Sequence, residues 1–224
     1  KYQLTVIVVN YNVEYFLDQC LTSVRKAIQG LKVEVIVVDN ASGDGSVELL
    51  EKKYSDLHLI LNNENVGFSK ANNQGINIAQ GKYVLLLNPD TIVEENSFQK
   101  VIDYMDAHED VGGLGVRMID GKGNFLPESK RGLPKPMVAF YKIFGLSRIF
   151  PKSKQFGQYH LGHLSEFETN EIDILSGAFM LMRKEALDKV GNLDEAFFMY
   201  GEDIDLSYRI QQGGYKNIYF PETT

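Results

Sequence analysis

Short apolar runs alternate with stretches of helical spacing through the first half of the chain. Such runs, bounded by polar turns, are typical of strands buried on both faces, as in a parallel sheet covered by helices. Strands are expected at residues 4–9, 33–38, 57–61, 83–87 and 111–118. Helices are expected over residues 17–28, 46–54, 69–79 and 98–105. This alternation predicts an α/β fold with a mostly parallel, doubly wound central sheet flanked by helices.

Serines stand at the expected starts of two of these helices. A serine hydroxyl at a helix start accepts a hydrogen bond from a backbone N–H of the first turn. Ser46 and Ser69 are therefore expected to cap the helices that follow them.

After Met118 the alternation becomes irregular. Strand character returns at residues 171–183, where Ser176-Gly177 interrupts it, and a helix is expected over residues 202–212. Residues 130–154 hold seven basic residues, no acidic residue and many bulky apolar ones. Two interpretations stay open: a surface loop packed on the body of the protein, or a lid that touches an anionic lipid surface.

Composition narrows the function classes. A formal net charge of -7 argues against a nucleic-acid partner, because binding to a phosphate backbone usually needs a basic face. Cys20 is the single cysteine, which leaves no intramolecular disulfide and no thiolate zinc site, and its helical spacing predicts a core position. No run reaches the length of a membrane span and no signal peptide is visible, so a cytoplasmic location is the default expectation.

Polar residues follow three of the expected strands at the point where each ends. They are Asn10-Tyr11-Asn12, Asp39-Asn40 and Asn88-Pro89-Asp90. The carboxyl ends of parallel strands share one edge of the sheet, where ligands bind in open α/β folds. Asp90 suits a hard divalent cation that carries substrate phosphates, and Asp39 could accept a ring N–H of uracil, thymine or guanine. Each is also compatible with an ordinary turn or helix cap.

Two further segments carry candidate site residues. Residues 65–73 are rich in small amides that could contact a nucleotide, although they could equally form a helix start with Asn72 and Asn73 merely exposed. Residues 201–206 place Glu202, Asp203 and Asp205 at a helix start, which the helix dipole partly explains. Asp205 stands four residues before Arg209, a spacing that favours an ion pair. The preceding aromatic residues 197–200 could shield the acids, line a sugar site or belong to the core.

These motifs, in this order, resemble family 2 glycosyltransferases, and the whole chain is similar to their rhamnosyltransferase-like branch. The resemblance rests on 8–12, 38–42, 65–73, 87–90 and 201–209. It implies a GT-A fold in one domain over residues 1–224, with a nucleotide-sugar-binding half at 1–118 and an acceptor-binding half at 119–224.

The family also implies roles for particular residues. Asp203, with Glu202, is implied as the catalytic carboxylate, and Asp90 as the ligand of Mn²⁺ or Mg²⁺. The nucleotide-sugar contacts it implies are Asn10, Tyr11, Asn12, Asp39, Asn40, Asn65, Gly67, Phe68, Asn72, Asn88 and Asp90. Asn88 replaces the first acid of the Asp-x-Asp pattern of many relatives. A metal-binding histidine that relatives often carry after a strand like 217–220 would lie beyond Thr224, so a C-terminally truncated chain is expected.

The implied activity is inverting transfer of a sugar from a dTDP- or UDP-sugar, with dTDP-rhamnose as one candidate, to a glycan or lipid-linked acceptor in cell-surface polysaccharide synthesis. A peripheral contact with the inner membrane face through residues 130–154 accompanies this hypothesis. The alternative is a nucleotide-sugar-binding module with weak catalysis. A nicotinamide-dependent oxidoreductase would need G-x-G-x-x-G after the first strand, where this chain has no glycine. A nucleotidyltransferase would usually place a Gly- and basic-rich loop there.

Overall fold

The computed structural model describes residues 1–134, 153 and 159–224. In this part of the chain eight strands form one mixed sheet in the order β3-β2-β1-β4-β7-β5-β8-β6. The strands are β1 Leu4–Asn10, β2 Val33–Asp39, β3 His58–Leu61, β4 Tyr83–Leu87, β5 Val111–Val116, β6 Asn170–Glu171, β7 Phe179–Arg183 and β8 Lys216–Phe220. The helices are α1 Glu14–Ala27, α2 Ser46–Lys53, α3 Phe68–Ile78, α4 Ser97–Ala107, α7 Lys184–Val190 and α8 Glu202–Gln212, with a 3₁₀ turn η1 at Pro127–Ser129.

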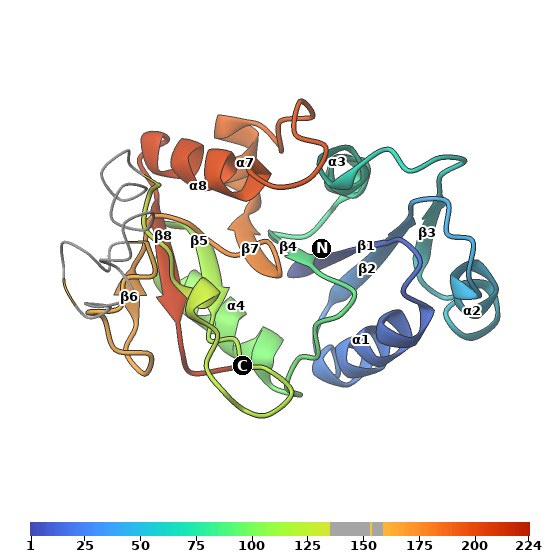
Figure 1. Cartoon of the computed structure of the whole chain (residues 1–224), viewed down its shortest axis with the longest axis horizontal. Helices are drawn as coiled ribbons and strands as arrows, with labels where there is room; N and C mark the ends of the chain where they lie inside the picture. Colours follow the sequence, from blue (N-terminus) through green and yellow to red (C-terminus); the bar gives the residue numbers. More distant parts are fainter. Residues whose placement is uncertain (135–152, 154–158) are drawn as a thin grey trace.

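Helices cover both faces of the sheet. Figure 1 shows α1 and α4 on one face and α3, α7 and α8 on the other. The two faces follow from the two-residue period of the strands. On β1, Val6 and Val8 pack toward α1 and α4, whereas Ile7 packs toward α3. Two apolar cores therefore lie on either side of one sheet, as the α/β prediction requires.

The four strands at one side of the sheet are parallel, and β7 runs against them. β1 pairs in parallel with β2 and β4, and β2 pairs in parallel with β3. β7 lies antiparallel between β4 and β5, so the loop before β7 reaches the edge at which β4 ends. This mixed arrangement confirms the expected α/β architecture with its mostly parallel central sheet.

The expected helix caps at Ser46 and Ser69 are wrong. The N-cap positions belong to Gly45 and Gly67, and each serine lies one or two residues inside its helix with a buried hydroxyl that has no partner. At the start of α2 it is the side chain of Asp44 that satisfies a free backbone donor, since its Oδ1 accepts from the Ser46 backbone N–H at 3.0 Å. Asp and Ser are both strong cap formers, so the sequence alone could not separate them.

Strand character at residues 171–183 is split into β6 and β7, with the loop that holds Ser176 between them. Within the described residues, no helix is both long enough and apolar enough to cross a bilayer.

Candidate active site

The expected convergence of strand ends occurs in the structure. The register pairs Asn10 with Asp39 across β1 and β2, and Val8 with Leu87 across β1 and β4. The loops that follow these three strands therefore leave the sheet at the same edge, as parallel pairing demands.

Asp39 is the acceptor at the centre of a buried polar cluster. It is only 1% exposed, and its Oδ1 accepts from Asn10 Nδ2 at 2.8 Å and from Ser42 Oγ at 2.7 Å. Its Oδ2 accepts from the Ser42 backbone N–H at 2.9 Å. The turn role of Asp39 is thus observed, and Oδ2 keeps one lone pair for another donor.

The loops after β1 and β2 are fastened to each other in strained conformations. Asn12 and Ala41 both have positive φ, at 55° and 63°. Asn12 Oδ1 accepts from the Gly43 N–H at 2.7 Å, which joins the two loops. Alanine gains nothing locally from a left-handed conformation, so the surrounding contacts hold it there, as is common at functional sites. Tyr11 projects beside them and is 48% exposed.

The small amides of residues 62–67 form a hydrogen-bonded network with Asn40. Asn40 Nδ2 donates to Asn65 Oδ1 and to the Gly67 carbonyl, both at 3.3 Å, and its Oδ1 accepts from Asn62 Nδ2 at 2.9 Å. Gly67 has φ 88°, and a Cβ there would overlap the Phe198 ring. These amides shape the wall beside the Asp39 cluster.

The alternative in which Asn72 and Asn73 are merely exposed at a helix start is wrong, because both are buried. Asn72 Nδ2 donates to the Phe68 carbonyl at 3.0 Å within α3. Asn73 joins α3 to the loop after α7, donating to the Leu193 carbonyl at 2.9 Å and accepting from its N–H at 3.1 Å. Asn73 therefore has a structural role, and the residue type alone gave no sign of these contacts with Leu193.

Asp90 is the exposed carboxylate at the end of β4. The backbone N–H of Asn88 donates to the Ala178 carbonyl at 3.1 Å, which anchors this loop to the segment before β7. Cys20 lies beneath the loop, with its Sγ 3.6 Å from the Asn88 carbonyl. Cys20 is fully buried, which confirms the predicted core position, and burial, with the charge of Asp90 second, raises the pKa of its thiol to about 12.

No cluster of three or more His, Cys, Asp or Glu side chains forms a metal cage among residues 1–134, 153 and 159–224. A single accessible carboxylate such as Asp90 fits a cation that shares its ligands with substrate phosphates, in the manner of Mg²⁺ sites, better than one held by protein alone.

The acids at the start of α8 have different partners. Asp205 pairs with Arg209, Oδ2 to Nη2 at 2.6 Å, which confirms the predicted ion pair. Asp203 is bonded to Arg131 through its Oδ2, and its Oδ1 accepts from the Ile204 N–H at 2.8 Å. The spacing along the chain gave no sign of the Arg131 contact, because the two residues lie far apart in sequence.

Glu202 is buried at 6% exposure, and its Oε2 has no hydrogen-bond partner. Burial, with the nearby Asp203 charge as a further cause, raises the pKa of the Glu202 carboxyl above its usual range. A buried carboxylate oxygen without a partner costs stability, so its presence here favours a role in the site over a role in the fold.

Glu202→Gln is expected to stabilise the protein near neutral pH. The raised pKa means that the folded state gains stability from Glu202 only when the carboxyl is protonated, and loses it as pH rises through the folded-state pKa. The melting temperature of the variant should exceed that of the parent at neutral pH, by roughly 2–4 °C for each kcal/mol regained. The difference should vanish below the ordinary glutamate pKa of 4.5. Scanning calorimetry across pH tests this, and a constant difference would contradict the burial argument.

The aromatic lead-in to α8 is not core. Phe198, Met199 and Tyr200 are 58%, 51% and 81% exposed. Tyr200 has a positive φ of 70°, and the Phe198 carbonyl accepts from the Phe68 N–H at 2.7 Å. The loop therefore presents apolar rings to solvent while its backbone is fixed to the start of α3.

Two contacts bring the acids of α8 to the strand-end loops. The segment before β7 bonds Asn88 through Ala178, and a Cβ on neighbouring Gly177 would lie 3.9 Å from Asp203 Cβ. On the other side, Phe198 meets Gly67 and Phe68. The structure therefore gathers the predicted site residues around one edge of the sheet, with Asn72 turned into its own helix.

Lys130 and Arg131 do not suit a lipid-facing patch. Lys130 is 3% exposed and donates to the carbonyls of Leu161 and Leu164. The Arg131 side chain is 13% exposed. Most of the predicted basic segment, residues 135–152 and 154, lies outside the described residues, so the lid and membrane hypotheses stay predictions for it.

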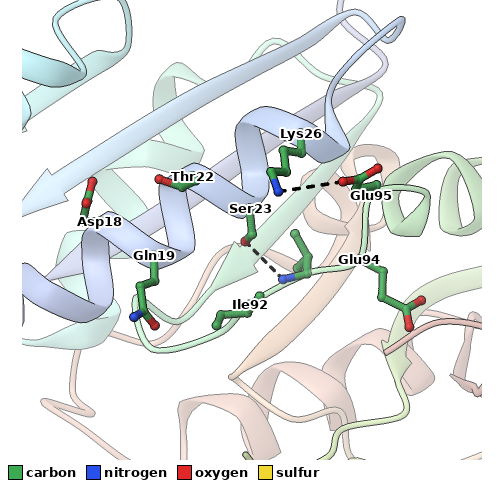
Figure 2. A pocket seen from close by; sticks show the side chains of 9 residues that line it. Asp18, Gln19, Thr22, Ser23, Lys26, Ile92, Glu94 and Glu95 are labelled. Carbon is green, nitrogen blue, oxygen red and sulfur yellow. Dashed lines mark hydrogen bonds and ion pairs between the residues drawn. The ribbon is translucent and has the colours of Figure 1, made fainter.

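An open pocket of about 380 Å³ lies between α1 and the loop before α4 (Figure 2). Its walls bond to each other, with Val93 N–H donating to Ser23 Oγ at 3.2 Å and Lys26 3.9 Å from Glu95. It contains none of the predicted site residues.

Comparison with known proteins defines the class. The solved structure of TarS 1–349 from S. aureus matches 98% of this chain and 58% of its own, with a TM-score of 0.68 at 20% identity. The mannosyltransferase PcManGT from Pyrobaculum calidifontis, solved with GDP-Man and Mn²⁺, matches 99% of this chain and 55% of its own, with a TM-score of 0.64 at 22% identity. The fold is that of GT-A glycosyltransferases.

The chain belongs to glycosyl transferase family 2, whose family model matches residues 5–191. It is 27% identical to the N-acetylglucosaminyl-diphospho-decaprenol L-rhamnosyltransferase of Mycobacterium tuberculosis, over 97% of this chain and 73% of that enzyme. It is also 27% identical to the poly-beta-1,6-N-acetyl-D-glucosamine synthase of Staphylococcus aureus, over 97% of this chain and 48% of that enzyme. The predicted family is confirmed, and the protein is a glycosyltransferase.

Proposed function

We propose that the protein transfers a sugar from a dTDP- or UDP-sugar to a hydroxyl of a glycan or lipid-linked saccharide, with inversion at the anomeric carbon. The observation that carries the proposal is the placement of Asp39, Asp90 and Asp203, from distant parts of the chain, around one edge of the sheet. The name of the M. tuberculosis relative supports a rhamnosyl donor and a polyprenyl-linked acceptor.

The donor half of the site is assigned to residues 1–118. The Asp39 carboxylate accepts the base N–H with its remaining lone pair. The surrounding contacts are Asn10, Tyr11, Asn12, Asn40, Asn65, Gly67, Phe68, Asn72 and Asn88. Asn10, Asn40 and Asn72 support this surface from inside, because their amides are already bonded to protein groups. Tyr11 is exposed and is the side chain free to stack on the base.

Asp90 would hold a divalent cation together with the donor diphosphate. When bound, that cation would neutralise the charge that develops on the diphosphate leaving group. Asp90 is exposed at the end of β4, so a cation bound to the donor diphosphate could reach it.

Asp203 is assigned as the general base. Its carboxylate takes the proton of the acceptor hydroxyl as that oxygen bonds to the anomeric carbon and the bond to the diphosphate breaks. One base suffices for a direct displacement, and no covalent sugar–enzyme intermediate forms. Glu202 lies beside it as the second acid of the site, and residues 119–224 supply the acceptor half.

A panel of nucleotide sugars tests the proposal. dTDP-rhamnose, UDP-GlcNAc, UDP-glucose and GDP-mannose are compared by thermal shift with and without Mn²⁺, because a ligand bound only by the folded state raises the melting temperature. Release of nucleoside diphosphate is then measured with a short polyprenyl-diphospho-GlcNAc as acceptor probe. Turnover with a dTDP- or UDP-sugar supports the proposal, and binding without release would favour the alternative of a catalytically weak binding module.

Asp39→Ala is expected to weaken UDP or dTDP binding by roughly 10–100-fold, the equivalent of a hydrogen bond to a charged group. The variant should also lose about 1–3 kcal/mol of stability, because buried donors of Asn10 and Ser42 lose their acceptor. Calorimetry below both melting temperatures measures the binding.

Ser42→Ala is the matched control, since it loosens the same turn and keeps the carboxylate. It should lower stability while preserving the preference for UDP or dTDP over ADP. Equal affinity losses in the two variants would show that Asp39 acts only through the turn.

A further inference from the structure

Arg131 bonds directly to one of the two proposed catalytic acids, Asp203. Its Nη2 donates to Asp203 Oδ2 and, at 2.6 Å, to the Leu175 carbonyl. The side chains of Arg131 and Asp203 are only 13% and 15% exposed. A charge-assisted bond with so little solvent competition fixes both partners more firmly than a surface ion pair would.

The other contacts of Arg131 make it part of a rigid frame. The Ile174 N–H donates to the Arg131 carbonyl at 3.0 Å, in an isolated antiparallel bridge. The next residue along, Leu175, donates its N–H to Ser207 Oγ at 3.1 Å, one turn after Asp203 on α8. Arg131 therefore bonds Asp203 at the start of α8 and also pairs with residues 174 and 175, which are themselves bonded to α8 through Ser207. These contacts leave the Asp203 side chain little freedom.

Asp203 is held at both oxygens yet keeps lone pairs for a proton. Oδ1 accepts from the Ile204 N–H and Oδ2 from Arg131. A carboxylate has about four acceptor positions, so these bonds orient the group without using all of them. A base must be held within about 0.5 Å of its productive position, and a misplacement of about 1 Å can cost about 10²-fold in rate.

We infer that Arg131 is a positioning residue: it holds the Asp203 carboxylate in the orientation in which it removes the proton of the acceptor hydroxyl. This inference rests on the proposed role of Asp203 as base. Arg131 itself exchanges no proton.

The test compares variants of the full-length protein, with the donor that gives turnover in the panel and polyprenyl-diphospho-GlcNAc as acceptor probe. Arg131→Ala should lower kcat by about 10–100-fold with little change in donor KM, since the misplaced group is the base. Arg131→Lys should recover part of the loss, because an ammonium supplies the charge but not the planar guanidinium whose Nη2 bonds both Asp203 and the Leu175 carbonyl. A loss that appears mainly in donor KM would assign Arg131 to the donor and overturn the inference.

Lys130→Met is the matched structural control. Lys130 is the adjacent buried cation, and it bonds the carbonyls of Leu161 and Leu164 rather than an acid of the site. Its loss should lower the melting temperature and leave kcat within a few-fold of the parent. If Lys130→Met loses as much kcat as Arg131→Ala, a loosened segment explains both and the inference fails.

A double variant separates this inference from the base assignment. If Arg131 acts through Asp203, Arg131→Ala should cost almost nothing further in the Asp203→Asn background. Losses that multiply would overturn the inference while leaving Asp203 as base. An active Asp203→Asn enzyme would instead overturn the base assignment itself.

Discussion

Asp203→Asn is expected to lower glycosyl transfer by ~10²–10⁴-fold, the usual contribution of a positioned general base. The amide keeps the size of the side chain and its place beside Arg131 but cannot take the proton. Donor affinity should be nearly unchanged, because the donor contacts lie on the strand-end loops. Steady-state kinetics with nucleotide-sugar binding measured in parallel checks both statements.

Asp205→Asn is the control for this substitution. It lies on the same turn of α8 but is committed to Arg209. Its loss should lower stability and leave kcat close to that of the parent. If Glu202→Gln is inactive and Asp203→Asn is active, the base has been assigned to the wrong carboxylate. If all three variants remain active, direct displacement at this site is refuted.

Asp90→Asn is expected to abolish any gain in donor affinity produced by Mn²⁺ or Mg²⁺. An amide oxygen is a much poorer ligand than a carboxylate for a hard cation, and Asp90 stands without a second acid in the Asn88-Pro89-Asp90 turn. Calorimetric titration of the donor nucleotide with and without metal measures the effect.

Asp103→Asn, an exposed carboxylate on α4, serves as the control and should keep the full metal response. Metal enhancement that survives in Asp90→Asn would show that other groups carry the cation.

Most of the parallel half of the fold could be predicted from sequence because its strands are buried on both faces. β4 was predicted with its observed bounds, and α8 likewise. The continuous apolar run of β4 and the glycine pair after α8 are local signals that tertiary contacts do not override. The antiparallel direction of β7 has no such signal, since a buried strand has the same composition in either direction.

Site residues at the ends of strands could be predicted from the sequence. Contacts between side chains that are far apart in the sequence could not. Asp39 and Asp90 could be found because a strand end fixes their place. The Arg131–Asp203 bond could not, since it depends on how the segment after β5 returns to the segment before β7. A basic run suggested a lipid surface for Lys130, whereas the fold buries its ammonium among carbonyls.

The reversed strand β7 affects how sequence can vary in this protein. It joins β4 to β5 through main-chain hydrogen bonds, which ask only an apolar character of Phe179 to Met182, whereas the side chain of the buried Arg183 donates to the carbonyls of Val111, Met105 and His108. The strand is therefore fixed by its two ladders and by one charged side chain at its end, where α7 begins at once with Lys184. A library for selecting new acceptors should therefore randomise exposed positions before α8 such as Met199 and Tyr200, and keep the loop before β7, where Ile172, Ile174 and Leu175 are buried.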